Sequence, residues 1–230
     1  MIWSDILAEI KRGLKEPSSG GHWTDAELLR RANIGQRRVV RMTHCLKAID
    51  TSNTSTSGTS EYNKPSTCLR LLRVYYKYSG QRLYPITKDD LDIYATESRV
   101  SRPWTDDSDE PTHYMDEPSS IILFPKPNAT GDAIGMEIII RPTALAAAGD
   151  IPFNAVAFME DYHDLIAAFV LWKCLLEDGD ARADAYKEEF FNGLRSIIAD
   201  LKGKPDSMDT FQLIRTARGR RKGPLPIHEG

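Results

Sequence analysis

The chain has 230 residues, 41% of them hydrophobic and 27% charged, and its 30 basic and 33 acidic side chains give a formal net charge of −3. A chain of this length and composition buries enough apolar surface to fold without disulfide or metal cross-links. Its three cysteines lie far apart, which argues against a disulfide framework or a zinc knuckle, and we expect reduced thiols. No apolar run approaches the ~18 residues of a membrane span and the N-terminus lacks the order of a signal peptide, so we expect neither a membrane protein nor a secreted one.

Charge is distributed unevenly along the chain. Residues 88–120 hold ten acidic and three basic side chains, a net charge of −7, whereas residues 213–224 hold five basic side chains and no acidic one, a net charge of +5. Separated zones of opposite charge suggest contacts between different molecules at least as much as within one. The alternative, which charge alone favours, is a solvated loop followed by a disordered tail.

The first fifty residues predict two helices. The first is short and carries an apolar stripe of Ile2, Ile6, Ile10 and Leu14. The second begins at Thr24, because Thr24 and Glu27 form a capping box. Its heptad-like apolar stripe continues to Ile49, so we expect this helix to span residues 24–50, with its arginines mostly off the stripe. We expect the apolar face of the helix to pack against other parts of the protein and the remaining surface of the helix to be basic.

The hydrophobic period changes to two in the middle of the chain, which predicts strands. Residues 72–78 and 81–84 form a hairpin pattern around the Ser79-Gly80 turn, and residues 120–124 and 136–141 have the pattern of two further strands. Residues 51–67 are rich in threonine and serine and almost without apolar side chains, so we expect a flexible linker into the sheet.

A second helical region follows Ile151-Pro152. From residue 165 to 176 it is apolar nearly all round, so we expect it to be central to a bundle or sandwiched between subunits. Gly179 ends this helix, and Asp180 can cap the next one, which runs to Gly203. The candidates for subunit packing are the aromatic residues of these stripes: Phe158, Tyr162, Phe169, Trp172 and Phe190.

Together these patterns predict an α+β fold, with an α-helical bundle of about four helices, an inserted small antiparallel β-sheet and an extended C-terminal arm. The expected domains are a helical bundle of residues 1–50 and 151–203, a flexible linker at 51–67, an inserted β domain with an acidic loop at 68–150, and an extended basic arm at 204–230.

The sequence contains none of the motifs expected of an enzyme. Neither phosphate-binding glycine loop is present, nor is the G-x-S-x-G nucleophile motif, and His44 and Cys45 are adjacent positions of a predicted helix that point apart. The histidines occur singly, and we interpret Asp161-Tyr-His-Asp164 as a polar patch because its ligands do not converge on one face. The acidic run 106–110 lacks the glycine and the distant glutamate of a calcium loop. We therefore expect no catalytic residue, no cofactor and no metal.

The basic residues leave a nucleic-acid interpretation open. Arg37 and Arg38, together with the basic tail, could neutralise phosphates, but the tail has no interleaved aromatic residues and the chain is acidic as a whole. A DNA-binding regulator that uses the basic helix 24–50 is kept as an alternative.

An ordered set of short motifs runs from Trp23 to Lys202. It consists of residues 23–33 and 36–39, the Arg-Val-x-Tyr-x-Tyr-x-Gly pattern at 73–80, residues 83–87, 91–92, 111–114, 122–127 and 138–142, and the Gly179-Asp180 junction of the closing helix pair. In this order the motifs resemble the head-to-tail adaptor (connector) proteins of tailed bacteriophages. Residues 51–67 and the tail after Gly203 depart from the shared pattern, which leaves open which neighbour each of them touches.

The resemblance implies a structural virion protein without catalysis. Such a protein forms a ring, with the twelvefold count of the portal, that joins the portal to the tail and lines the DNA channel. The implied partners are the portal protein, copies of itself, a downstream tail or nozzle protein and genome DNA that passes non-specifically, with no membrane. The implied location is the portal vertex of the virion, and the host cytoplasm before assembly. A tail-completion or tail-tube ring protein is the alternative within this class.

The C-terminal tail is expected to act as a docking arm for the portal or another partner. Its prolines and glycines prevent a regular helix or central strand, so we expect disorder in the free subunit and order on a partner. An acidic portal face, the acidic zone of a neighbouring subunit or DNA could receive it, and we favour a protein surface because the arm lacks stacking aromatics and must not hinder passage of the genome. The candidate binding residues are Phe211, Leu213, Ile214, Arg215, Arg218, Arg220, Arg221 and Lys222.

Overall fold

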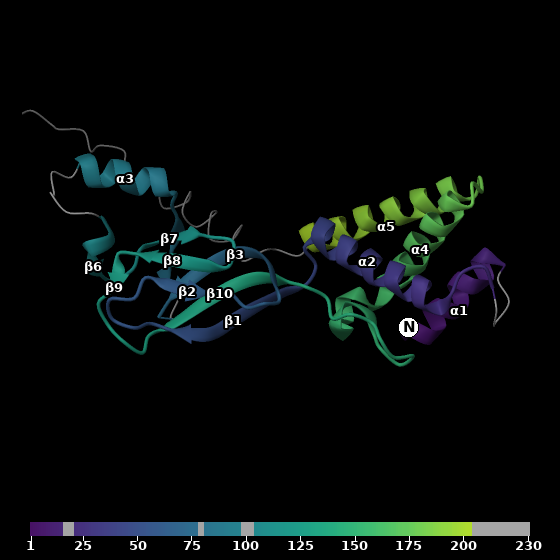
Figure 1. Cartoon of the computed structure of the whole chain (residues 1–230), viewed down its shortest axis with the longest axis horizontal. Helices are drawn as coiled ribbons and strands as arrows, with labels where there is room; N and C mark the ends of the chain where they lie inside the picture. The colour runs from purple at the N-terminus through teal and green to yellow at the C-terminus, as the bar shows by residue number, and fades with distance from the viewer. Residues whose placement is uncertain (16–20, 78–80, 98–103, 204–230) are drawn as a thin grey trace, which may run out of the picture.

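The computed structural model describes residues 1–15, 21–77, 81–97 and 104–203. Within these ranges five α-helices and ten strands form an α+β molecule, elongated, with a helical part at one end and a β part at the other (Figure 1). The chain enters the β part after its second helix and returns to the helical part after its last strand.

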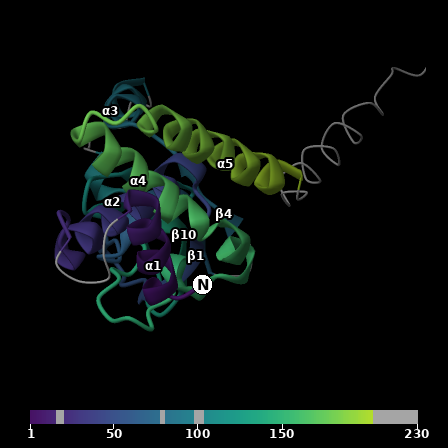
Figure 2. The same cartoon turned by 90° about the vertical axis from the view of Figure 1, so that its right-hand side faces the viewer.

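The helical part consists of α1 (Trp3–Leu14), α2 (Asp25–Thr43), α4 (Asp164–Glu177) and α5 (Ala183–Gly203). Two 3-10 turns, η2 (Pro152–Ala155) and η3 (Ala157–Tyr162), lead into α4. Helix α4 contacts α1, α2 and α5, and the view onto the helical part shows it beside all three (Figure 2). The expected burial of this helix is confirmed along most of its length, although Leu176 near its end is 55% exposed.

The three neighbours of α4 approach it at glycines: Gly13 of α1, Gly35 of α2 and Gly193 of α5. A Cβ atom at Gly35 would lie 2.8 Å from Cδ1 of Phe169, and one at Gly193 would lie 2.1 Å from Cδ2 of Leu165. Because glycine has no side chain, the backbones come close enough for these large residues of α4 to fill the space between the helices.

The predicted capping box at the start of α2 is confirmed. The backbone N–H of Thr24 donates to Glu27 Oε2 over 3.0 Å, and the N–H of Glu27 donates to the Thr24 hydroxyl over 3.3 Å. Hydrogen bonds from the side chain and the backbone of Thr24 lower the pKa of Glu27. Both residues therefore satisfy backbone donors that the first helical turn leaves free.

Replacing Thr24 by alanine should lower the free energy of unfolding by about 1 kcal/mol, because the N–H of Glu27 loses its acceptor. Urea denaturation of the whole protein measures this change. Thr24→Ser is the matched control, since serine keeps the hydroxyl and should stay close to the parent protein. A midpoint of Thr24→Ala equal to that of the parent would show that this cap adds nothing to stability.

The prediction that the second helix reaches Asp50 was wrong. Helix α2 ends at Thr43, and His44 takes the left-handed conformation with φ 56°, which turns the chain into strand β1 (Lys47–Thr54). The apolar stripe continues past the turn only in sequence: Leu46 is buried at 1% exposure, whereas Ile49 is 59% exposed on β1. For the same reason, His44 and Cys45 are not neighbours on a helix.

The β part contains three sheets. The first is antiparallel in the order β1-β10-β3-β4, with β10 (Ala133–Ile140), β3 (Cys68–Tyr76) and β4 (Gln81–Arg82). The second has the order β2-β8-β7-β5, with β2 (Glu61–Asn63), β8 (Ser120–Phe124), β7 (His113–Asp116) and β5 (Tyr84–Pro85). Strands β6 (Ser108–Asp109) and β9 (Lys126–Pro127) form the third, and helix α3 (Lys88–Glu97) with the 3-10 turn η1 (Trp104–Asp106) completes the part.

The first two sheets share one hydrophobic core. Side chains of the first sheet, such as Val74 and Met136, and of the second, such as Ile121 and Leu123, are at most 1% exposed and belong to a single cluster. This core is separate from the larger one around α4. Strands β3 and β4 pair antiparallel, as the hairpin pattern predicted, and its turn at Ser79-Gly80 lies outside the described residues. The predicted second strand, 81–84, is divided between β4 and β5 of the other sheet.

The predicted fold class was wrong. A bundle of about four helices with a small inserted antiparallel sheet does not describe a molecule with ten strands in three sheets, two parallel strand pairs and a fifth helix in the β part. Residues 51–67, expected as a flexible linker, hold the end of β1 and all of β2, and the acidic zone 88–120, expected as a loop, holds α3, β6 and β7. The division into a helical domain and an inserted β domain stays a proposal, and the expected arm at 204–230 lies outside the described residues.

Candidate functional site

Helix α2 holds the segment that leads from β10 back to the helical part. Nε2 of the fully buried Gln36 donates to the carbonyl of Thr143 over 2.8 Å, and its Oε1 accepts from the N–H of Phe153 over 3.3 Å. Asn33 bonds both backbone groups of Leu145, accepting from its N–H over 2.8 Å and donating to its carbonyl over 3.0 Å. A fifth hydrogen bond, from Gln36 Nε2 to Asn33 Oδ1, joins the two side chains. The two amides thereby fix the returning segment to α2.

The same segment contains three successive residues in the left-handed conformation. Phe153, Asn154 and Ala155 have φ values of 54°, 58° and 54°, a region that residues with a side chain rarely adopt. The strained turn is held at Phe153, which is buried and bonded to Gln36, and at Asn154, whose side chain accepts from the N–H of Thr143 over 2.7 Å. Contacts with the rest of the fold offset the local strain.

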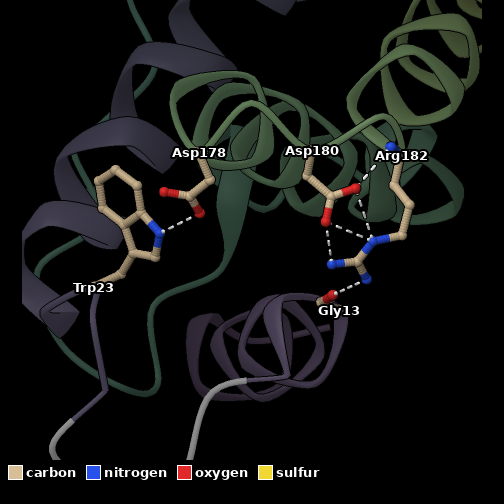
Figure 3. Close-up of polar contacts among 5 residues, drawn as sticks. All are labelled: Gly13, Trp23, Asp178, Asp180 and Arg182. Carbon is tan, nitrogen blue, oxygen red and sulfur yellow. Dashed lines mark hydrogen bonds and ion pairs between the residues drawn. The ribbon is translucent and has the colours of Figure 1, made fainter.

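Polar contacts connect the turn between α4 and α5 to the end of α1 and the start of α2 (Figure 3). Trp23 donates through Nε1 to Asp178 over 3.4 Å. Arg182 donates to both carboxylate oxygens of Asp180 and to the carbonyl of Gly13, the latter over 3.1 Å. The hydrogen bonds from the side chain and the backbone of Arg182 lower the pKa of Asp180. The turn after Gly179 is thus tied to the end of α1 and to the start of α2.

The aromatic residues predicted for subunit packing lie mostly inside the chain. Phe169, Trp172 and Phe190 are 2%, 7% and 0% exposed, and the Phe169 and Phe190 ring centroids are 5.2 Å apart. Phe158 and Tyr162 on η3 are half-buried, and the Tyr162 hydroxyl donates to Asp200. A contribution of these residues to contacts between subunits stays a prediction, and the three buried rings have little free surface for it.

Basic side chains collect along α2 and its neighbours. The guanidinium carbon of Arg31 lies 4.5 Å from the centroid of the Trp23 ring, and Lys173 Nζ lies 3.9 Å from the centroid of the Trp172 ring. Burial lowers the pKa of Lys173, and the nearby charges of Arg38, Arg31 and Lys187 lower it further. Positive charges therefore face one another on this side of the helical part.

The C-terminal half of α2 borders a shallow surface hollow, which we call the basic groove. Its apolar members Ile34 and Met42 are 42% and 44% exposed. Within the described ranges, none of its four arginines forms an ion pair with a carboxylate. The groove is lined by Ile34, Arg37, Arg38, Arg41 and Met42 of α2, by Leu69 of β3 and by Arg141.

The described residues contain no candidate metal site. Among them there is no group of three or more His, Cys, Asp and Glu side chains that could hold a metal ion. Burial lowers the pKa of His163 and raises that of Cys174 to about 12, so neither group is charged near neutral pH. No helix in the described part of the chain has both the length and the hydropathy to cross a membrane. The basic groove combines charged side chains with exposed apolar ones.

Sequence reasoning identified the basic face of α2 but not the residues that position it. Asn33 and Gln36 lay within the motif set, yet their role depends on a segment more than 100 positions away in the chain. The available signal was Gln36 itself, a polar residue beside the apolar stripe of the predicted helix. Leu69 and Arg141 reach the groove only through the tertiary fold.

Comparison with known protein families gives one match that extends along nearly the whole chain. The family model described as "SU10 adaptor protein" matches residues 1–220. This range includes residues 1–22 and 203–220, which the motif resemblance left out. No curated protein matches the sequence at a significant level.

Proposed function

The chain belongs to the SU10 adaptor protein family, and on that premise we propose that it forms the ring that joins the phage portal to the tail. Family membership makes the chain a bacteriophage adaptor and a virion component. The proposal adds the position at the portal vertex, the ring and the central DNA channel. The observation that carries it is the family match over residues 1–220.

The charge distribution supports assembly from many copies. The basic groove lies where the C-terminal half of α2 meets Leu69 of β3 and Arg141. Helix α3, with exposed acidic residues on it, lies at the far end of the β part (Figure 1). Two different complementary surfaces on one subunit allow head-to-tail contacts, which close into a ring when the rotation between subunits fits. A purified subunit can still be monomeric, because the portal raises the effective concentration of bound copies.

In this arrangement the partners are the portal protein, neighbouring copies, a tail or nozzle protein below the ring, and genome DNA that passes without sequence-specific contacts. The work of the protein is binding and positioning, so we propose no catalytic step and no cofactor. A tail-completion or tail-tube ring would differ from the proposed adaptor ring in its neighbouring protein, since the adaptor ring contacts the portal.

The composition of assembled particles tests the proposal. Quantitative mass spectrometry of purified particles should find this protein in about twelve copies, the portal count that the resemblance implies for a closed ring. Particles blocked before tail attachment should already contain it, which separates a head-to-tail adaptor from a tail-tube protein. Absence from particles, or a single copy in each, would contradict the ring.

A further inference from the structure

The basic groove has the chemistry of a docking surface for an acidic segment that also carries an apolar side chain. Arg37, Arg41 and Arg141 offer positive charge with no carboxylate paired to them among the described residues. Ile34 and Met42 expose apolar surface between these charges. Like charges held close together raise the energy of the free subunit, and an acidic partner relieves that repulsion.

Helix α3 of the same chain has the complementary chemistry. Leu91, fully buried, packs α3 onto Met115 and Phe124, and Trp104 Nε1 donates to Asp92 over 2.9 Å. The start of the helix is fixed by a second cap, in which Asp90 accepts from the N–H and the hydroxyl of Thr87.

The outer face of α3 is acidic and apolar at once. Asp89 and Asp92 are exposed, and Ile93 is 55% exposed. Asp89 and Ile93 are four positions apart, so they lie on one side of the helix. We call Asp89, Asp92 and Ile93 the acidic face of α3.

A subunit cannot bring its own acidic face into its own groove. Helix α3 lies at the far end of the β part, and α2 lies in the helical part (Figure 1). Each copy therefore offers one groove and one acidic face to other copies. An interface between unlike surfaces of identical subunits is the kind that generates rings.

Protein fits the groove better than DNA does. A DNA backbone supplies phosphates for the arginines but no apolar group for Ile34 and Met42, whereas Ile93 on α3 supplies one. The groove-lining residues of the described structure also include no aromatic side chain on which a base could stack.

We propose that the basic groove of α2 binds the acidic face of α3 from a second copy of this chain. This inference rests on the proposed ring and names the two surfaces that meet in it. Ile93 lies between Ile34 and Met42 of the neighbour, and Asp89 and Asp92 face the groove arginines.

Site-specific cross-linking between full-length copies tests this contact, and assembled portal rings are present because they raise the effective concentration of the bound copies. A chain with Met42→Cys is mixed with a chain that carries Ile93→Cys, and a short bismaleimide is added. The mixture should give a cross-linked dimer that neither chain gives alone. The unmodified chain measures the background from the native thiols, of which Cys45 and Cys174 are buried and Cys68 is half-buried. Ile49→Cys, at an exposed isoleucine of β1, replaces Met42→Cys as the matched control.

Charge reversal in the same assay tests the recognition. Adding Arg41→Glu to the Met42→Cys chain should reduce the dimer yield about tenfold, because like charges then face each other. Adding Asp89→Arg to the Ile93→Cys chain should restore the yield. A folding defect of the Arg41→Glu chain could not be repaired by a change in the other chain. The yield should also fall as salt is raised.

Three results would overturn the inference. One is a yield of the Met42 and Ile93 pair no higher than that of the Ile49 control, and a second is a failure of Asp89→Arg to restore cross-linking. The third is duplex DNA binding that Arg41→Glu abolishes while cross-linking stays at background, which would make DNA the occupant. If particles contain many copies but cross-linking fails, the proposed contact is wrong and the proposed ring stands. If cross-linking succeeds but particles lack the protein, the proposed ring function is wrong.

Discussion

Replacing Phe169 by alanine is expected to lower the free energy of unfolding by about 3 to 5 kcal/mol. The ring is 2% exposed and packs against Trp172 and Phe190, with centroid distances of 5.8 and 5.2 Å. It also covers the place where Gly35 brings α2 close to α4. Its removal leaves a cavity between three helices that cannot collapse without moving one of them. Urea denaturation, followed by tryptophan fluorescence, measures the loss.

Two control variants test the cavity, and the dependence on protein concentration separates packing within the subunit from packing between subunits. Leu176→Ala, on the same helix but at a 55% exposed position, should change stability by less than about 0.5 kcal/mol. Adding Gly35→Ala to Phe169→Ala should cost less than the sum of the single changes, because the new methyl group occupies part of the cavity. The loss should not depend on protein concentration, since the neighbours of Phe169 belong to its own chain. A Phe169→Ala protein as stable as the parent would show that this core is not tightly packed.

Signals that act between neighbouring residues were read correctly from the sequence. The capping box at Thr24 predicted the start of α2, because both partners lie within one helical turn. The end of the same helix was missed, because the apolar spacing continues past His44 while the backbone turns there into the left-handed region. A periodic pattern shows which side chains can share a face and does not show that the backbone stays helical.

The extent of the β part could not be predicted from hydrophobic pattern. Strand β1 lies at the edge of its sheet and pairs with β10, which lies some 80 positions further along the chain. Its threonine and serine side chains face solvent, so they resemble a linker until the partner strand is known. Strand β2 is short and pairs with β8, again through a contact distant in sequence.

The apolar stripes predicted which side chains are buried but not which part of the structure covers them. Phe169, Trp172 and Phe190 were expected to be covered by other helices or by a second subunit, and side chains of the same chain cover them. The basic face of α2 was visible in the sequence because arginines lie off the packed stripe. The groove itself was not, because Arg141 and Leu69 join it from two strands of the β part or their ends.

Removing residues 204–230 is expected to abolish attachment to the portal while the folded body stays intact. Helix α5, the last described element, ends at Gly203, so every described helix and strand is still encoded in the shortened chain. The deleted segment holds the apolar anchors Phe211, Leu213 and Ile214 followed by the five basic residues of 213–224. Thermal unfolding checks the body, and co-sedimentation with assembled portal rings measures attachment.

A shorter deletion tells which part of the arm binds. Removing only 221–230 takes away Arg221 and Lys222 but keeps the anchors and the three other basic residues, and it ends the chain where the family match ends. This variant should still attach to the portal at low salt. As salt is raised, it should detach at a lower salt concentration than the parent does, because fewer charges remain to support the same anchors. Ordering the arm costs free energy at the moment of binding, so anchors and charges have to act together, and deletion of the anchors should be the more severe change. Normal attachment after removal of 204–230 would show that the portal is held by the folded body and that the arm serves another partner.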